Sequence, residues 1–149
     1  MREILFRGKD IETGKWVYGY LCVIPQDNQA PELNIQEYKE HQNGMMCEYE
    51  TTLYAVDPDT VGQYTELKDT NGIMIFEGDI IKANDFYYDK TGGNVADTIV
   101  IGEVVWDMDR YIVVMGETEW LLGELYLNDD DFEVIGNIHD DPELLEVEE

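Results

Sequence analysis

The chain has 149 residues, with 34 Asp or Glu, 9 Lys or Arg and 2 His, which gives a formal net charge of −25. Such an acidic surface repels phosphate backbones and anionic lipid headgroups, which argues against direct binding to nucleic acid or to membranes. Hydrophobic residues make up 44% of the chain, enough for a packed core, so we expect one folded domain over residues 1–149, with a subdivision into 1–55 and 56–149 as the alternative.

The sequence lacks the residues and motifs that several common types of functional site require. The chain contains no serine, no standard glycine-rich phosphate-binding motif and no zinc-binding spacing of His or Cys. We therefore predict no catalytic, cofactor-binding or metal-binding residues. The N-terminus lacks a signal-peptide pattern and no apolar run reaches 18 residues, which favours a cytoplasmic protein without a membrane span. Cys22 and Cys47 are interpreted as buried free thiols.

In the first half of the chain, the pattern predicts short strands joined by turns. Ile4–Arg7 and Trp16–Ile24 are rich in β-forming residues and flank a glycine-containing turn, which indicates a hairpin. The stretch after Pro31 is predicted as a helix that ends at Asn43–Gly44, because proline and Glu32 suit a helix start. Met45–Val56 is then predicted as a strand, because its second half is rich in β-branched and aromatic side chains.

In the second half, turn residues separate further short strands. Such spacing is typical of an all-β fold, and we predict a small barrel or sandwich of antiparallel strands. Asp141–Leu145 begins with an acid and a proline, which predicts a short C-terminal helix. The predicted strands are Ile73–Phe76, Ile80–Lys82, Ile99–Trp106, Arg110–Met115, Glu119–Leu122, Leu125–Leu127 and Phe132–Ile138.

Three sequence blocks resemble the YopX-like family of phage and prophage proteins. They are Arg2–Arg7, then Val56–Gly72 continuing to Ile80, and Glu133–His139 followed by Pro142–Leu145. One departure is Glu66, where the family usually has Gly. The resemblance implies a phage-encoded, soluble, mainly β protein in the cytoplasm of a bacterial host. It implies no established activity and supplies no catalytic residues.

A turn near the middle of the chain is similar to the start of a calcium loop. With Gly72 at the sixth loop position, the first and twelfth ligands would be Leu67 and Gly78, which have no side-chain oxygen. We therefore interpret Asp69–Gly72 as a turn without a metal.

Two segments are candidates for contact with a partner. Phe86, Tyr87 and Tyr88 are consecutive, so a strand would place their rings on both faces and at least one ring outside the core. The alternative is that these rings cover the open end of a barrel. Asp129, Asp130 and Asp131 lie in a segment from Tyr126 to Glu149 that has ten acids and no Lys or Arg. The alternative for this triplet is a solvated turn.

Three functional hypotheses follow. The first is a non-catalytic interaction module whose partner is a host or phage protein, with self-association through sheet edges as a further option. The second is an acidic mimic of nucleic acid that blocks a host DNA-binding protein. The third is an enzyme that uses surface carboxylates, although 34 acids select no particular pair.

Overall fold

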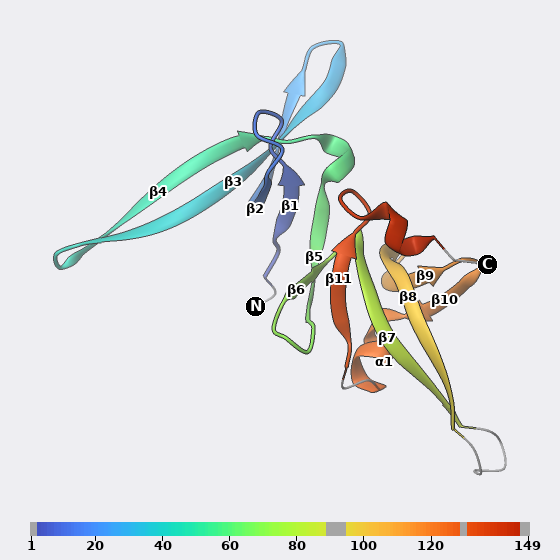
Figure 1. Cartoon of the computed structure of the whole chain (residues 1–149). Helices are drawn as coiled ribbons and strands as arrows, with labels where there is room; N and C mark the ends of the chain where they lie inside the picture. The colour runs from blue at the N-terminus through green and yellow to red at the C-terminus, as the bar shows by residue number, and fades with distance from the viewer. Residues whose placement is uncertain (1–2, 89–94, 129–130, 147–149) are drawn as a thin grey trace. The chain divides into compact units, whose positions relative to one another are not determined.

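A computed structural model describes residues 3–88, 95–128 and 131–146 (Figure 1). The chain divides into two compact units, Met1–Tyr64 and Thr65–Glu149. The elements are β1 (Phe6–Lys9), β2 (Trp16–Gln26), β3 (Gln29–Asn43), β4 (Met46–Ala55), η1 (Pro58–Thr60), β5 (Gly62–Lys68), β6 (Met74–Phe76), β7 (Asp79–Tyr88), β8 (Val95–Asp107), β9 (Arg110–Met115), β10 (Thr118–Leu121), α1 (Leu122–Asn128), β11 (Glu133–Asn137) and η2 (Pro142–Leu145).

The strands form two sheets, which confirms the mainly β prediction. One sheet has six strands in the order β4-β3-β2-β1-β5-β6, and the other has five in the order β10-β9-β8-β7-β11. The pairs β1–β2, β1–β5, β2–β3, β3–β4, β7–β8, β7–β11, β8–β9 and β9–β10 are all antiparallel. Short antiparallel strands follow from the sequence, because turn residues interrupt the β-rich runs before a helical crossover could fit.

The first unit has a small core. Val17, Ile35 and Val56 are buried there, and Phe6 and Tyr54 are among the side chains that pack against them. The predicted first hairpin is confirmed, since β1 pairs with β2 from Phe6 opposite Gly19 to Lys9 opposite Trp16. The carboxylate of Asp10 accepts a hydrogen bond from the N–H of Glu12 at 3.0 Å within the connecting turn.

The predicted helix after Pro31 is wrong, because residues 29–43 form the long strand β3. Within this segment Ile35 is buried in the core and Leu33 packs against it, which is the period-two spacing of a strand and not the spacing of a helix. Pairing with β2 from Gln29 to Gln36 and with β4 from Asn34 to Asn43 therefore decides the conformation. Pro31 lies where the register between β2 and β3 shifts, a place that tolerates a residue without an N–H.

The second unit has the larger core, which β7, β8 and β9 share with α1. Buried members include Ile81, Val104 and Phe132. The strand predicted at Leu125–Leu127 is wrong: residues 122–128 form α1, because Leu122 and Leu125 are one helical turn apart and both enter this core. The predicted C-terminal helix is present as the short 3-10 helix η2.

The position at which the sequence departs from the YopX-like pattern has an unusual backbone. Glu66 has a φ of 72°, a left-handed conformation that glycine adopts without steric cost and other residues seldom adopt. The neighbouring turn is as predicted: Asp69 accepts hydrogen bonds from the N–H groups of Asn71 and Ile73, and Gly72 has a φ of 80°.

Candidate protein-interaction surface

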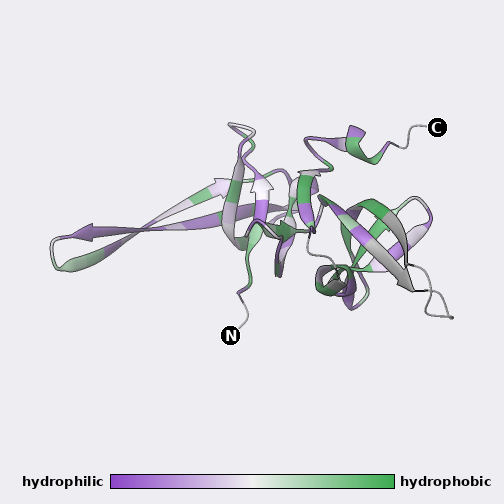
Figure 2. Cartoon of the chain, turned by 60° about the horizontal axis from the view of Figure 1, so that its bottom comes forward, coloured by the Kyte–Doolittle hydropathy of each residue, from purple (hydrophilic) through white to green (hydrophobic). Residues whose placement is uncertain are grey.

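The β3–β4 hairpin extends beyond the strands that support its base (Figures 1 and 2). β2 pairs with β3 only as far as Gln36, so residues 37–43 of β3 pair with β4 alone. We call residues 37–52 the ribbon. Every residue from Tyr38 to Thr51 is exposed. A two-stranded hairpin without a core is marginally stable in water, so a partner that covers the ribbon would stabilise it.

The ribbon ends in a tight two-residue turn. Asn43 pairs with Met46 across it, and Gly44 has a φ of 66°, as the first central residue of a type II′ turn requires. Cys47, next to this turn, is exposed, and Cys22 is partly exposed. The interpretation of both as buried thiols is therefore wrong, because Cys47 belongs to the ribbon, where every residue from Tyr38 to Thr51 is exposed.

Three tyrosines on one side of the sheet surround a single depression, and we call them the tyrosine face: Tyr20, Tyr38 and Tyr49. The depression has a volume of about 480 Å³. The rings of Tyr20 and Tyr38 meet edge to face with centroids 5.6 Å apart. Their exposed fractions are 51% for Tyr20, 51% for Tyr38 and 68% for Tyr49. Three aromatic side chains are thus gathered at a surface that the described residues of the chain leave open.

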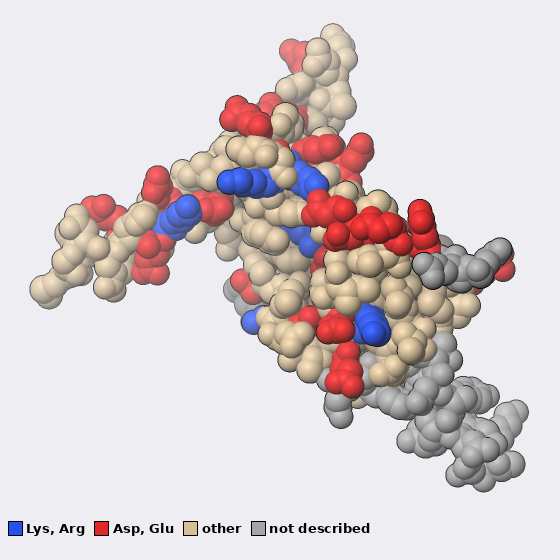
Figure 3. All heavy atoms as spheres, viewed as in Figure 1, with Lys and Arg blue, Asp and Glu red and all other residues tan. Residues whose placement is uncertain are grey.

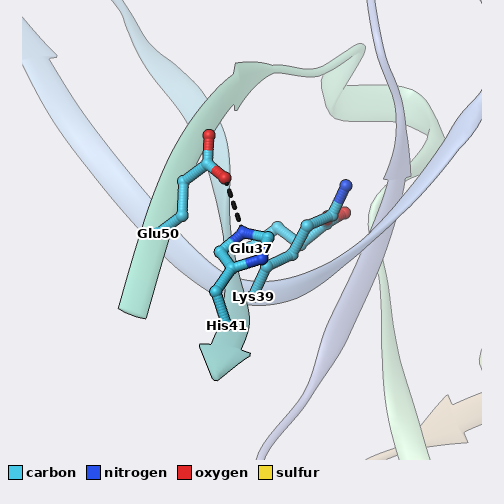
Figure 4. A network of polar contacts seen from close by, with 4 residues as sticks. All are labelled: Glu37, Lys39, His41 and Glu50. Atoms are coloured by element: carbon cyan, nitrogen blue, oxygen red, sulfur yellow. Dashed lines mark hydrogen bonds and ion pairs between the residues drawn. The ribbon is translucent and has the colours of Figure 1, made fainter. Parts of the chain in front are cut away.

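The opposite side of the ribbon is charged (Figure 4). The imidazole Nε2 of His41 lies 2.8 Å from a carboxylate oxygen of Glu50, and the ammonium of Lys39 lies 3.4 Å from Glu37. Glu48 is on this side too, directly opposite His41. We call these five residues the charged face. It holds three glutamates and one lysine, and acidic atoms also outnumber basic ones along the hairpin in Figure 3.

The sequence prediction missed this surface because it assigned the first half of the ribbon to a helix. As a strand, the segment alternates: Tyr38 and Glu40 point to one side, and Glu37, Lys39 and His41 point to the other. A period-two reading of residues 37–41 would have placed Tyr38 and Glu40 on one side, and Glu37, Lys39 and His41 on the other.

The structure describes only some of the residues that the sequence predicts to contact a partner. The backbone of Phe86, Tyr87 and Tyr88 belongs to β7 and pairs with Val95–Asp97 of β8, but their side chains lie outside the described part of the chain. Asp129 and Asp130 also lie outside it, while Asp131 is exposed. Contact between these residues and a partner stays a prediction.

A polar cavity in the second unit bears on the enzyme hypothesis. It has a volume of about 390 Å³, and its lining includes Lys82, Asn84, Asp131 and Glu133. Lys82 of β7 pairs directly with Glu133 of β11. The cavity is therefore lined by one ammonium group and by the carboxylates of Asp131 and Glu133. Within residues 3–88, 95–128 and 131–146, no group of three or more His, Cys, Asp or Glu side chains is placed to hold a metal ion.

Comparisons with known proteins place the chain in a family and a fold. The family model described as YopX protein matches residues 5–146. The crystal structure of protein EF1440 from Enterococcus faecalis is similar, with a TM-score of 0.59 and 24% sequence identity over 98% of this chain and 100% of that one. At this identity the similarity shows the fold. A search of curated proteins found no match. None of the helices in the described segments is long and apolar enough to cross a membrane.

Proposed function

The chain belongs to the YopX protein family, and we propose that it is a phage-encoded, non-catalytic interaction module that binds a host or phage protein in the bacterial cytoplasm. The phage origin and the cellular location rest on the resemblance described above. The interaction role rests on the exposed tyrosine face.

The observation that carries this proposal is the exposure of Tyr20, Tyr38 and Tyr49 around one depression. Tyrosine is enriched at protein interfaces because it buries a large rigid ring while its hydroxyl still reaches a polar partner. A few such residues near the centre of an interface usually carry most of its binding energy. Tyrosines scattered singly would need no explanation, but three around one depression, two of them on a coreless ribbon, favour a docking role.

The hypothesis of a nucleic-acid mimic gains less support from the ribbon. Seven residues per strand span about 24 Å, over which duplex DNA carries about 14 charges. Residues 37–52 contain four Glu and one Lys, so their net charge is 1 − 4 = −3. The lysine-free segment from Tyr126 onward is the remaining candidate for a mimic.

Partner capture tests the proposed function. The purified protein is immobilised, incubated with host lysate, and the bound proteins are identified and quantified for the native chain and for the double variant Tyr38→Ala/Tyr49→Ala. We expect the variant to capture at least tenfold less of one specific partner. Its thermal midpoint should not change, because both rings are exposed.

The matched control is Tyr126→Ala, which removes another exposed tyrosine from α1. It should leave capture unchanged. Equal capture by the native chain and the double variant, or an equal loss in the control, would overturn the tyrosine face as the docking surface. Release of the same partner by added DNA would favour the mimic instead.

A further inference from the structure

The outer strand of the ribbon has an open hydrogen-bonding edge. β4 is the terminal strand of its sheet, and β3 is the one strand hydrogen-bonded to it in the described part of the chain. At its last residue the edge is already occupied, because the carbonyl oxygen of Ala55 accepts a hydrogen bond from the N–H of Ile11. β4 runs for ten residues and pairs with β3 without a register shift from Asn34 opposite Ala55 to Asn43 opposite Met46. Such an edge presents a row of N–H and C=O groups to any additional strand.

The turn geometry identifies which residues present those groups. In a two-residue hairpin, the residues that flank the turn form a hydrogen-bonded pair, and pairs then alternate along the strands. Since Asn43 and Met46 flank the turn, Glu48, Glu50 and Thr52 direct their backbone groups toward β3. Tyr49 and Thr51 therefore direct theirs to the open edge.

The sequence of β4 leaves this edge without most of the usual protection. Natural sheets block long edges with charged side chains, Lys above all, with Pro or with a bulge. β4 has the sequence MCEYETTLYA, without Lys, Arg, Pro or Gly, and its pairing is unbroken. The charges it does carry are Glu48 and Glu50. Carboxylates deter an acidic strand and attract a basic one.

This charge selects the occupant. Two β4 edges related by a twofold axis near residues 48–50 would set Glu48 or Glu50 directly opposite a glutamate of the other copy, and like charges opposite each other destabilise a strand pair. Each copy also carries a net charge of −25. A second copy is therefore a poor occupant. A basic segment is favoured instead, because it is attracted both to Glu48 and Glu50 and to the net negative charge of the chain.

We propose that the open edge of β4 binds an extended segment of a partner protein in which Lys or Arg alternates with apolar or aromatic residues. Its main chain would bond to the outward groups of Tyr49 and Thr51. Because side chains alternate, its basic residues would lie beside Glu48 and Glu50, and its apolar residues would lie beside Tyr49. This inference rests on the proposed function and adds the chemistry of the partner.

The test uses a fluorescein-labelled ten-residue peptide of alternating lysine and isoleucine, with binding to the full chain followed by fluorescence anisotropy. Thr51→Pro removes one outward N–H, a change that an edge strand tolerates where that N–H faces solvent. Thr51→Ala is the matched control, because it removes the side chain and keeps the N–H. We expect at least tenfold weaker binding for Thr51→Pro and less than a twofold change for Thr51→Ala.

Two further peptides keep the test independent of any unfolding of the proline variant. In a second peptide, methyl groups replace the N–H protons that would face β4, which are those of every second residue. This peptide should bind the native chain at least tenfold more weakly, because it cannot donate hydrogen bonds to the edge. A peptide with glutamate in place of lysine should not bind. Glu48→Gln/Glu50→Gln should weaken binding of the lysine peptide at least fivefold.

Equal binding of the methylated and unmethylated peptides would show attraction by charge alone and would overturn strand addition. Absence of binding by the lysine peptide would overturn it as well, and so would a concentration-dependent dimer of the native chain that Thr51→Pro converts to a monomer. None of these outcomes would contradict the tyrosine-dependent capture of a host protein. Failure of that capture, with the peptide results as expected, would instead remove the tyrosine face.

Discussion

The buried carboxylate of Asp69 accepts a hydrogen bond at 3.0 Å from the backbone N–H of Val134, which lies 65 positions later in the chain. Its other oxygen accepts from the N–H groups of Asn71 at 2.9 Å and Ile73 at 2.8 Å. One side chain thus shapes the turn before β6 and attaches β11 to that turn. Only 6% of Asp69 is exposed, so water cannot replace these bonds.

Replacing Asp69 by asparagine should destabilise the protein by about 2–3 kcal/mol, because the amide NH₂ would face an N–H that has lost its charged acceptor. Urea unfolding of the two proteins measures the difference. Asp27→Asn is the control, since Asp27 is exposed and should change the free energy of unfolding by less than about 0.5 kcal/mol. Equal midpoints for all three proteins would contradict the role of Asp69.

Glycine at position 66 should stabilise the fold by about 1 kcal/mol relative to alanine there, because the backbone φ of 72° is strained for any residue with a Cβ. Both Glu66→Gly and Glu66→Ala lack the glutamate side chain, so the difference in stability between the two variants reports the backbone effect. Thermal unfolding provides the measurement. A variant with alanine as stable as the one with glycine would show that the turn relaxes out of this conformation.

Two glycines should respond to alanine with opposite signs. A Cβ on Gly102 would lie 2.6 Å from the carbonyl oxygen of Val114, so Gly102→Ala should cost about 1–3 kcal/mol as the strands shift apart. A Cβ on Gly123 in α1 would meet nothing within 4 Å, so Gly123→Ala should stabilise the fold by up to about 1 kcal/mol. Denaturant midpoints that move in the same direction would contradict this packing.

Burial raises the pKa of Glu103 above its ordinary value. The native state then holds this proton more strongly than the unfolded chain, so stability falls as the pH rises through the raised pKa. Glu103→Gln should therefore raise the free energy of unfolding at pH 7, and its advantage should vanish below the ordinary pKa of glutamate.

A control is needed for Glu103 because removal of any negative charge relieves repulsion in a chain of net charge −25. Glu117→Gln makes the same change at an exposed position. Unfolding of the three proteins between pH 3 and pH 7 separates the effects. Equal gains at pH 7 for the two variants would mean that burial of Glu103 contributes nothing.

Local chemistry determined much of this structure directly. The aromatic and β-branched residues of Arg110–Met115 predict the strand β9 with its observed bounds, because such residues favour a strand locally. The Asp69–Gly72 turn could also be predicted, since the bonds from Asp69 to Asn71 and Ile73 span only a few residues. The overall β class needed no more than these local signals and the spacing of turns.

Other features depend on partners that are distant in sequence. Residues 29–43 form a strand because β2 bonds to their first half and β4 to their second half, and residues 122–128 form a helix because Leu122 and Leu125 enter a core built by other strands. The tyrosine face requires Tyr20 of β2 to meet Tyr38 of β3. Only the pairing register brings these rings together, because exposure and contact depend on which strands become neighbours.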